Sequence, residues 1–402
     1  MATAGSKYVV QRLDGVRRAN LAVVSRTIDR LRIASQTAIS EETGLANGAA
    51  ANLLAELRRI GLVEDTEIAA TGARGRPRRA VRLAPRFALA VGVEVSVEAV
   101  AISVRGTDGV ELANSCTRQE RRPDSLPAAV LDVLAEYEKL LGTTGLPPLT
   151  ASLVIALPGV VAAPHLRVPP FGWTDVLVPD LIRTAPPTVR RLAFLNDGDA
   201  AVIAEAALRP EVECVAAIHG SDGIGGGVSL NGRLFSGAGG AAGQFGHVVV
   251  ETSGRPCHCG NRGCLCQYVS TTAFAKDLQE GTALAALGHR GYAADLATRA
   301  RRGDSAALTL LKSAKGRLSQ AVDVLGAVLS PETVVLTGNL APLASWLVSS
   351  PSSRTPAQEY RAEWSRPVEG SALGQDSAVS GAAVAARTAI LDDPLSFATA
   401  LP

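Results

Sequence analysis

The chain has 402 residues, which is enough for two or three domains, and its formal net charge at pH 7 is only +2. Hydrophobic residues make up 47% of it and aromatic residues 4%, so the cores must be built mainly from Ala, Val, Leu and Ile. No apolar run reaches the roughly 18 residues of a membrane helix, and Met1–Lys7 lacks the apolar stretch of a signal peptide, so we expect a cytoplasmic protein without a membrane partner.

The small net charge hides an uneven distribution. Residues 1–86 hold 15 Lys and Arg against 8 Asp and Glu, whereas residues 87–402 hold 25 against 30. A basic first segment on an acidic body favours contact with a polyanion in the first segment alone. Chance scatter of surface charge is the alternative. We therefore expect one domain over 1–86 and a second over 87–402.

Helical patterns fill most of the first segment. Three helices are predicted, over about residues 16–33, 37–43 and 47–60. Gly44 suits the end of the second helix, and Asn47 is an acceptable N-cap for the third. Two helices, a tight turn with glycine and a further helix follow the order of a helix-turn-helix.

A basic loop follows the third helix. Two short strands around the Gly, Arg and Pro residues of 71–79 predict a wing, whose arginines suit phosphates or the minor groove. A solvated linker is the alternative. Asparagine can pair with adenine, and alanine methyls can touch thymine. The predicted DNA contacts are Asn47, Ala49, Ala51, Asn52, Arg74, Arg76, Arg78 and Arg79.

The pattern changes after Phe87. A near-continuous apolar run over 89–104, a turn at 107–109 and a further apolar stretch predict a β-hairpin. A helix around 130–140 and a buried strand over 152–157 follow. Strands that alternate with helices predict an α/β body.

A glycine-rich strand-turn and a cysteine-rich loop lie farther along the body. The turn is Asp222–Gly227, which taken alone often marks only a tight hairpin. The loop has the spacing His-x9-Cys-x-Cys-x4-Cys. Three thiolates and one imidazole complete a tetrahedral structural zinc site, with the ligands His247, Cys257, Cys259 and Cys264. His258 and Cys266 are nearby spares, and Cys116 and Cys214 are expected to be buried small hydrophobic residues.

Together, the glycine-rich turn and the zinc loop resemble the ROK family, named for repressors, open reading frames and sugar kinases. The resemblance implies an actin-like ATPase, sugar-kinase-like body with two lobes over 87–402, with the zinc loop at 247–264. The segment over 1–86 resembles the winged helix-turn-helix that precedes this body in the repressors of the family.

The first phosphate loop of the kinase members is altered. They turn between the first two strands through an Asp-x-Gly-Gly-Thr-like loop that binds ATP phosphates, and the matching stretch here is Val93–Ala99. Both glycines are absent, Val97 is β-branched, and Glu98 places a negative charge where phosphate would lie. The loop beside the adenine keeps only Gly338 of the usual paired glycines. We therefore expect no ATP binding and no enzyme activity.

The resemblance places the effector contacts at Asn196, Asp197, Gln244 and His247. In the kinases the Asp is a general base and the Asn orients it; without an ATP loop, Asp197 would bind a hydroxyl rather than catalyse. A cap on the next helix is the alternative role. Three contacts of the family are changed, because Gln244 and Cys266 replace glutamates and Pro170 replaces an asparagine; of these, Gln244 keeps its hydrogen-bonding capacity.

The sequence thus predicts a transcriptional regulator, by resemblance a repressor, of carbohydrate-related or secondary metabolism genes. Its partners would be a double-stranded DNA operator and a sugar or sugar-derived effector. It would act as a homodimer or homotetramer, since paired half-sites give specificity that one module lacks. Two alternatives stay open: a ROK-type sugar kinase with an extra N-terminal module, and a regulator without a small-molecule effector.

Overall fold

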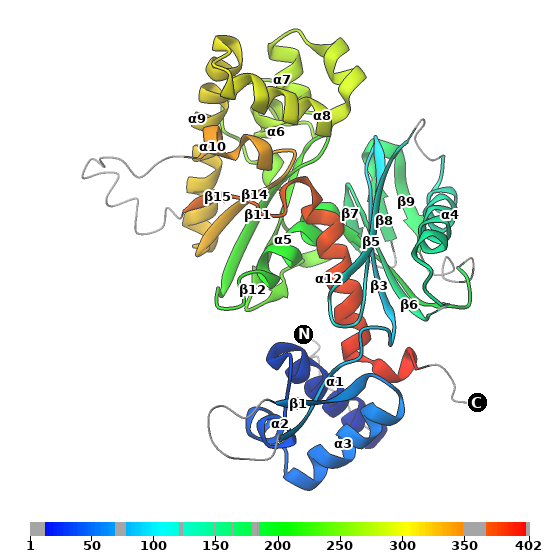
Figure 1. Ribbon diagram of the computed structural model, residues 1–402. Coiled ribbons are helices and arrows are strands. Elements are labelled where there is room, and N and C mark those ends of the chain that lie inside the picture. Colours follow the sequence, from blue (N-terminus) through cyan, green and yellow to red (C-terminus); the bar gives the residue numbers. More distant parts are fainter. Residues whose placement is uncertain are drawn as a thin grey trace, which may run out of the picture.

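The computed structural model describes residues 13–68, 78–119, 124–147, 149–162, 165–178, 183, 185–348 and 367–398. An N-terminal helical module lies below two lobes, and a long helix near the C-terminus runs between the lobes and down to the module (Figure 1). None of the described helices is both long and apolar enough to cross a bilayer.

The N-terminal module consists of three helices followed by a pair of strands, and it is called the winged module below after that strand pair. Its elements are α1 (Leu13–Leu31), α2 (Gln36–Thr43), α3 (Asn47–Arg59), β1 (Val63–Ile68) and β2 (Arg78–Leu83). The two strands pair antiparallel, and an isolated bridge between Ala34 and Val81 fastens the α1–α2 turn to the wing. Buried residues such as Leu21, Leu54 and Leu57 form its core.

The caps of these helices agree with the prediction at one position and not at another. Gly44 ends α2 in the left-handed conformation, with φ of 69°. Asn47 is the first helical residue of α3 rather than its N-cap, because Ala46 takes the capping position without a side-chain hydrogen bond. The preceding helix, α2, does have a side-chain cap: the Oγ of Ser35 accepts from the N–H of Ala38 at 3.1 Å. The side chain of Asn47 is therefore not needed to start the helix.

The first lobe is built on a five-stranded sheet in the order β10-β6-β3-β4-β5. Its elements are β3 (Leu89–Val95), β4 (Ala99–Arg105), β5 (Glu111–Arg118), α4 (Leu126–Thr144), β6 (Ala151–Leu157) and β10 (Val189–Asn196). The apolar run predicted over 89–104 is two strands, which turn at 96–98. A small sheet of β7 (Val160–Ala162), β8 (His165–Val168) and β9 (Trp173–Leu177) adjoins this lobe.

The second lobe carries the other five-stranded sheet, in the order β13-β12-β11-β14-β15. Its strands are β11 (Cys214–Gly220), β12 (Ile224–Leu230), β13 (Arg233–Leu234), β14 (Thr333–Gly338) and β15 (Val368–Gly370). Its larger helices are α7 (Thr271–Asp277), α8 (Gly281–Arg301) and α9 (Ser305–Leu329), and α5 (Asp197–Ala207) lies between the sheets.

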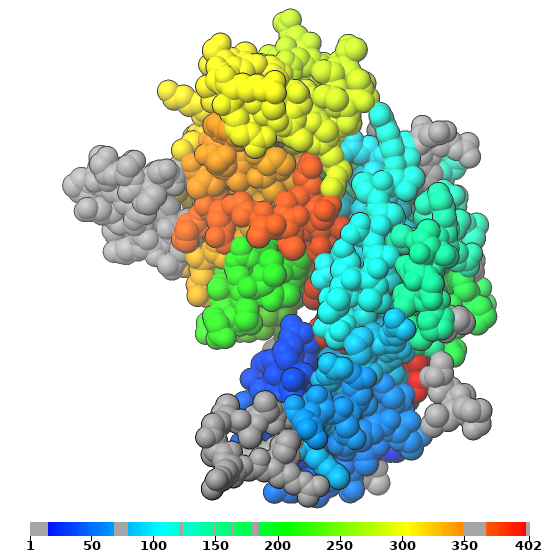
Figure 2. All heavy atoms as spheres, viewed as in Figure 1, coloured from blue at the N-terminus to red at the C-terminus, as the bar shows by residue number. Residues whose placement is uncertain are grey.

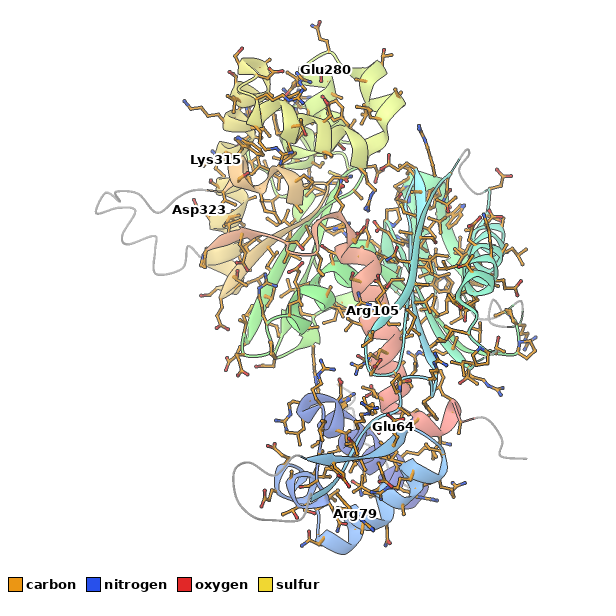
Figure 3. All side chains as sticks on the ribbon, in the orientation of Figure 1. Glu64, Arg79, Arg105, Glu280, Lys315 and Asp323 are labelled. Carbon is orange, nitrogen blue, oxygen red and sulfur yellow. The ribbon has the colours of Figure 1, made fainter. Side chains whose placement is uncertain are left out.

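Helix α12 (Ser377–Asp392) joins the three parts of the molecule. It packs against β3 and α5, and Arg105 of β4 donates to its Ser380 at 3.4 Å (Figure 3). At its other end Arg387 forms an ion pair with Asp29 of α1 and donates to the carbonyl of Thr107 at 2.7 Å. Leu391 is part of the core of the winged module. The module is therefore held by the body through this helix.

Candidate effector pocket, metal centre and DNA-binding surface

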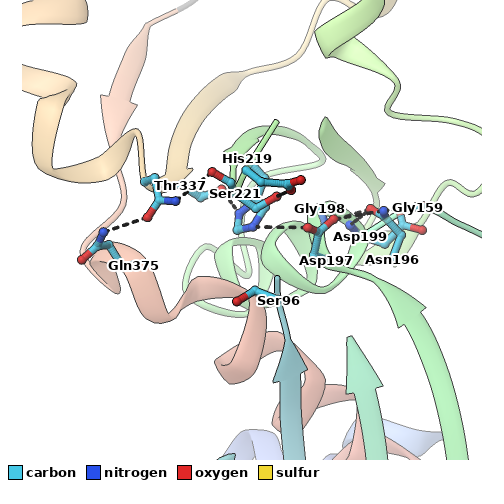
Figure 4. Close-up of polar contacts among 12 residues, drawn as sticks. Ser96, Gly159, Asn196, Asp197, Gly198, Asp199, His219, Ser221, Thr337 and Gln375 are labelled. Carbon is cyan, nitrogen blue, oxygen red and sulfur yellow. Dashed lines mark hydrogen bonds and ion pairs between the residues drawn. The ribbon is translucent and has the colours of Figure 1, made fainter. Parts of the chain in front are cut away.

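A buried polar cluster lies where β10 ends and α5 begins (Figure 4). Asn196 caps α5, its Oδ1 accepting from the N–H groups of Gly198 and Asp199 at 2.8 and 3.1 Å. The Nδ2 of Asn196 donates to the carbonyl of Gly159 at 2.6 Å and to Asp197 Oδ1 at 3.0 Å. The cap is thus made by Asn196, which also fixes the orientation of the Asp197 carboxylate.

The protonation of this cluster is set by burial. Burial, together with the nearby Asp222 carboxylate, raises the pKa of Asp197 to about 7. His219 Nε2 lies 3.9 Å from Asp197 Oδ2, and its Nδ1 lies 3.0 Å from the hydroxyl of Thr337. Burial lowers the pKa of His219 to about 4, so the imidazole is neutral at pH 7. The pair can therefore hydrogen-bond a hydroxyl without carrying two full charges.

The glycine-rich strand β12 brings two other segments close to this cluster. A Cβ at Gly226 would lie 2.2 Å from the carbonyl oxygen of Ala217 and 2.4 Å from the ring of Phe245. The backbone of Gly226 is also packed closely against two other glycines, Gly198 of α5 and Gly243, because a Cβ added at either would clash with it. Gln244, which follows Gly243, is exposed. The glycines of β12 therefore serve close packing between α5 and the loop that carries Gln244.

His247 and three cysteines form a compact cluster of potential metal ligands. The ligand atoms of His247, Cys257, Cys259 and Cys264 all lie within 4.8 Å of one another. The separations from Cys259 Sγ to Cys264 Sγ and from His247 Nδ1 to Cys257 Sγ are both 3.7 Å. A tetrahedron with Zn–S bonds of about 2.3 Å has edges of about 3.8 Å. A disulfide is excluded at 3.7 Å, so the geometry fits a four-coordinate metal.

Two further residues border this metal centre. Cys266 Sγ lies 3.7 Å from Cys257 Sγ, and His258 Nδ1 lies 3.9 Å from the same sulfur. The loop is anchored through Tyr268, whose hydroxyl accepts from the N–H of Arg255 at 2.8 Å and whose ring lies under the guanidinium of Arg317. The metal cluster is thereby connected to α9.

The prediction for the two isolated cysteines is wrong. Cys116 is exposed on β5, and Cys214 is half-buried. Cys116 faces the space between the lobes because the strand that carries it forms the edge of the first sheet. Neither thiol is a core residue.

A small cavity lies between the lobes, at the turn between β3 and β4. Its lining includes Glu94, Glu98, Asp222, Arg290 and Asn339. Burial raises the pKa of Glu94 to about 8, against the opposing charge of Arg290, and Glu94 Oε2 has no hydrogen-bond partner among the described residues. A neutral glutamic acid is a poor ligand for the Mg²⁺ ion that accompanies the phosphates of a nucleotide.

Glu98 has a structural partner that the sequence did not indicate. Its carboxylate accepts hydrogen bonds from the backbone N–H groups of His289 and Arg290 in α8, the latter at 2.9 Å. The charge that was expected only to repel phosphate is therefore bound to the second lobe. Sequence reasoning missed Glu94 and Arg290 and the partners of Glu98, because a contact between residues 98 and 289 spans almost half of the chain.

The predicted DNA contacts lie partly within the described residues. Asn47, Ala49 and Asn52 are exposed on α3, and Ala51 is half-buried. Arg79 is exposed on β2 (Figure 3).

The other predicted contacts are less well defined. Arg78 begins β2, whereas Arg74 and Arg76 lie outside the described residues. Nearby arginines are paired: Arg58 with Asp65 at 2.8 Å and Arg82 with Glu64 at 2.6 Å. The exposed start of α3, with its small and amide side chains, is the kind of helix face that fits a DNA groove.

Comparison with known proteins agrees with this architecture. A family model described as "ROK family" matches residues 90–389. The DNA-binding transcriptional dual regulator NagC of Escherichia coli is 25% identical over 415 residues, with 96% of each chain covered. A glucokinase of Thermotoga maritima is 34% identical over 181 residues, which cover 42% of this chain and 56% of the glucokinase.

Two crystal structures share the fold. One, described as a ROK family transcriptional regulator and homolog of the E. coli MLC protein, has a TM-score of 0.74 at 22% identity and covers 95% of this chain and 98% of its own. The other, a ROK family glucokinase from Streptomyces griseus in complex with glucose and AMPPNP, has a TM-score of 0.60 at 22% identity and covers 74% of this chain and 99% of its own.

Proposed function

The chain belongs to the ROK family, and from that membership we propose that it is a DNA-binding transcriptional regulator whose kinase-like body senses an effector. One observation carries the proposal. The three-helix N-terminal module is packed onto the ROK body, and the likeness to the NagC regulator covers 96% of this chain, whereas the kinase structure covers only 74% of it. Regulation as a repressor of carbohydrate-related or secondary metabolism genes follows as the specific form of the proposal.

The DNA-binding part would use the N-terminal half of α3 and the wing. Asn47, Ala49, Ala51 and Asn52 would lie at the major groove, and the wing arginines Arg74, Arg76, Arg78 and Arg79 would contact phosphates or the minor groove. One module reads few base pairs, so the operator would be a double-stranded site with paired half-sites bound by a homodimer or homotetramer.

The body would bind a polar effector at the start of α5. Asn196 and Asp197 are buried and oriented, so they can hold a sugar hydroxyl, and Gln244 and His247 would complete the contacts from the adjacent loop. Structural Zn²⁺ would be held by His247, Cys257, Cys259 and Cys264, which fixes the loop. The metal would supply rigidity only, since four protein ligands leave no open position.

We propose that the body does not transfer phosphate. The turn at 96–98 lacks the glycines of a phosphate loop, and the Glu98 carboxylate is engaged by α8. The buried Asp197 and the glucokinase relative favour a sugar kinase as the second candidate. A phosphotransfer assay with ATP and several hexoses decides between them, because measurable turnover would establish the kinase.

The decisive experiment is fluorescence anisotropy with the DNA upstream of the protein's own gene and with a scrambled duplex, at two salt concentrations. We expect nanomolar binding that discriminates the two duplexes. Arg79→Ala should weaken binding to both and reduce the salt slope, whereas Arg302→Ala, an exposed arginine at the end of α8, should change neither. Equal, weak, salt-sensitive binding of both duplexes would reject the regulator.

The existence of an effector is tested separately by thermal shifts across a panel of sugars and sugar derivatives. A ligand that binds the native state raises the unfolding temperature by mass action. Asp197→Asn should abolish such a shift. A panel without any shift would leave the regulator and remove its small-molecule effector, which is the third candidate.

A further inference from the structure

Helix α8 is broken once, beside the cavity between the lobes. Gly288 has φ of 71° and ψ of 173°, which separates the helix into a segment over 281–287 and a segment over 289–301. Such a break leaves carbonyl groups at the end of the first segment and N–H groups at the start of the second without partners inside the helix. These groups need partners from elsewhere.

The first lobe supplies partners of the appropriate charge to both ends. The Glu98 carboxylate accepts from the N–H groups of His289 and Arg290 at the start of the second segment. The Arg118 guanidinium donates to the carbonyl groups of Ala285 and Ala286 at the end of the first, both at 3.3 Å. An anion thus faces a helix N-terminus and a cation faces a helix C-terminus, the favourable arrangement at each end.

The two charged residues are held as one unit in the first lobe. The N–H of Gln119, next to Arg118, donates to the carbonyl of Glu98 at 2.8 Å. Only glycine fits at the break, because a Cβ at Gly288 would lie 2.3 Å from Glu98 Oε2 and φ is positive. The broken helix and the carboxylate therefore fit each other closely.

A second set of bonds extends this contact to the start of α12. The Arg290 side chain pairs with Asp376 at 2.6 Å and donates to the carbonyl of Gln375 at 3.0 Å. Gln375 Nε2 in turn donates to the carbonyl of Arg290 at 3.1 Å and to Asn339 Oδ1 at 2.8 Å. Atoms of the α8 region and of the first lobe meet on the face shown in Figure 2.

We propose that Glu98 and Arg118 form an interlobe latch that holds the cavity closed without a bound nucleotide. The Glu98 carboxylate takes the place that the phosphate of a ligand takes at other helix N-termini. The latch keeps the two lobes in one arrangement in the effector-free protein, and it extends the proposed function by naming what sets that arrangement. It does not depend on DNA binding.

The first test is hydrogen–deuterium exchange of the full-length zinc-containing protein with Glu98→Gln. This variant keeps the shape of the side chain and removes its charge. We expect exchange of the peptide that contains residues 289 and 290 to become roughly tenfold faster, as the loss of charge-assisted bonds implies. Glu138→Gln, at an exposed carboxylate of α4, is the matched control and should change nothing in that peptide. Unchanged exchange in Glu98→Gln would overturn the proposal.

The second test separates a latch between lobes from a local cap. Small-angle scattering of Glu98→Gln, of Arg118→Ala and of the double variant should show a larger radius of gyration than the wild type. The double variant should open little more than either single variant, because both residues act on one contact. Faster exchange with an unchanged radius in all three would reduce Glu98 to a local cap and overturn the latch. The far-ultraviolet circular dichroism spectrum shows that each variant is folded.

Discussion

The two lobes each contain a tight turn between antiparallel strands beside the same cavity, and the two turns differ in how they act. The turn at 96–98 in the first lobe contributes a charged side chain, Glu98, to the opposite lobe. The turn at 221–223 in the second lobe leads into a strand whose Gly226 is needed because neighbours occupy the place of a Cβ. One turn acts through a side chain and the other through the absence of one.

This difference shows that a retained glycine pattern and a retained function are separate matters. The glycines of β12 could be taken as a preserved phosphate loop, yet Gly226 is accounted for by packing against Ala217 and Phe245. The turn at 96–98, which has no glycine, makes an interlobe contact through Glu98. The following predictions test the contrast, from the largest expected effect to the smallest.

Loss of the metal centre should destabilise the region of the turn at 221–223 and leave the turn at 96–98 unaffected. The loop that carries His247 packs on β12, since a Cβ at Gly246 would lie 2.0 Å from the carbonyl oxygen of Ile224. We expect Cys264→Ser to lose zinc and to lower the free energy of unfolding by on the order of 4 kcal/mol or more. Zinc analysis and urea unfolding measure both. Hydrogen exchange that increased equally in β3 and β12 would contradict the separation of the two turns.

A methyl group added at Gly226 of β12 should destabilise the protein more than one added at the adjacent Gly225. Gly226→Ala should lower the free energy of unfolding by about 2–3 kcal/mol, because the new methyl group meets the backbone of Ala217. Gly225→Ala is the matched control, with nothing within 4 Å of the added Cβ, and should cost less than about 1 kcal/mol. Equal losses in urea unfolding would show that packing does not explain the glycines.

Asp197 and His219, near the turn at 221–223, should make the free energy of unfolding depend on pH in opposite directions. Asp197 has a raised pKa of about 7 in the folded state, so the folded chain binds more protons than the unfolded chain between about pH 4 and 7, and its contribution is lost as the pH rises. His219 has a lowered pKa of about 4, so its contribution is lost as the pH falls below about 6.5.

Single substitutions should therefore expose each slope. From pH 5 to pH 7, Asp197→Asn should make the free energy of unfolding rise relative to the wild type, by up to about 2 kcal/mol. His219→Gln should make it fall more steeply with pH than in the wild type. Urea midpoints at several pH values measure both. Parallel pH profiles for the wild type and both variants would show that neither group titrates in this range.

The turn at 96–98 should tolerate a glycine in place of Val97. Val97 is half-buried at the edge of the cavity, and its neighbour Glu98 makes the interlobe contact. Val97→Gly should lower the free energy of unfolding by less than about 1 kcal/mol, mainly through the greater freedom of the unfolded chain. It should not confer ATP binding in an equilibrium titration. Tight ATP binding by this variant would show that Val97 alone had closed the site.

Local patterns predicted the parts of the molecule that are fixed locally. The helices of the winged module follow from apolar spacing, and Gly44 marks a helix end as expected. The metal cluster follows from spacing alone, because its ligands come from one short loop. The N-cap at Asn47 was misplaced by one residue, since an adjacent Ala46 can take the same backbone conformation without a side-chain bond.

The remaining features depend on contacts between distant segments. Nothing near Glu98 in the sequence indicates that α8 breaks at Gly288, 190 residues later, and that its free N–H groups donate to this carboxylate. The exposure of Cys116 follows from the position of β5 at the edge of the sheet, which the order of the strands along the chain does not reveal. Sheet order and helix breaks are properties of the assembled fold.

Helix α12 has a consequence for how the protein is made. Leu391 lies in the core of the winged module, and Arg387 pairs with Asp29 of α1. The module is synthesised before the body, yet its core includes Leu391, which follows both lobes in the sequence. A chain that stops before α12 therefore lacks part of the core of the winged module, and the module is held firmly to the body only after α12 has been synthesised.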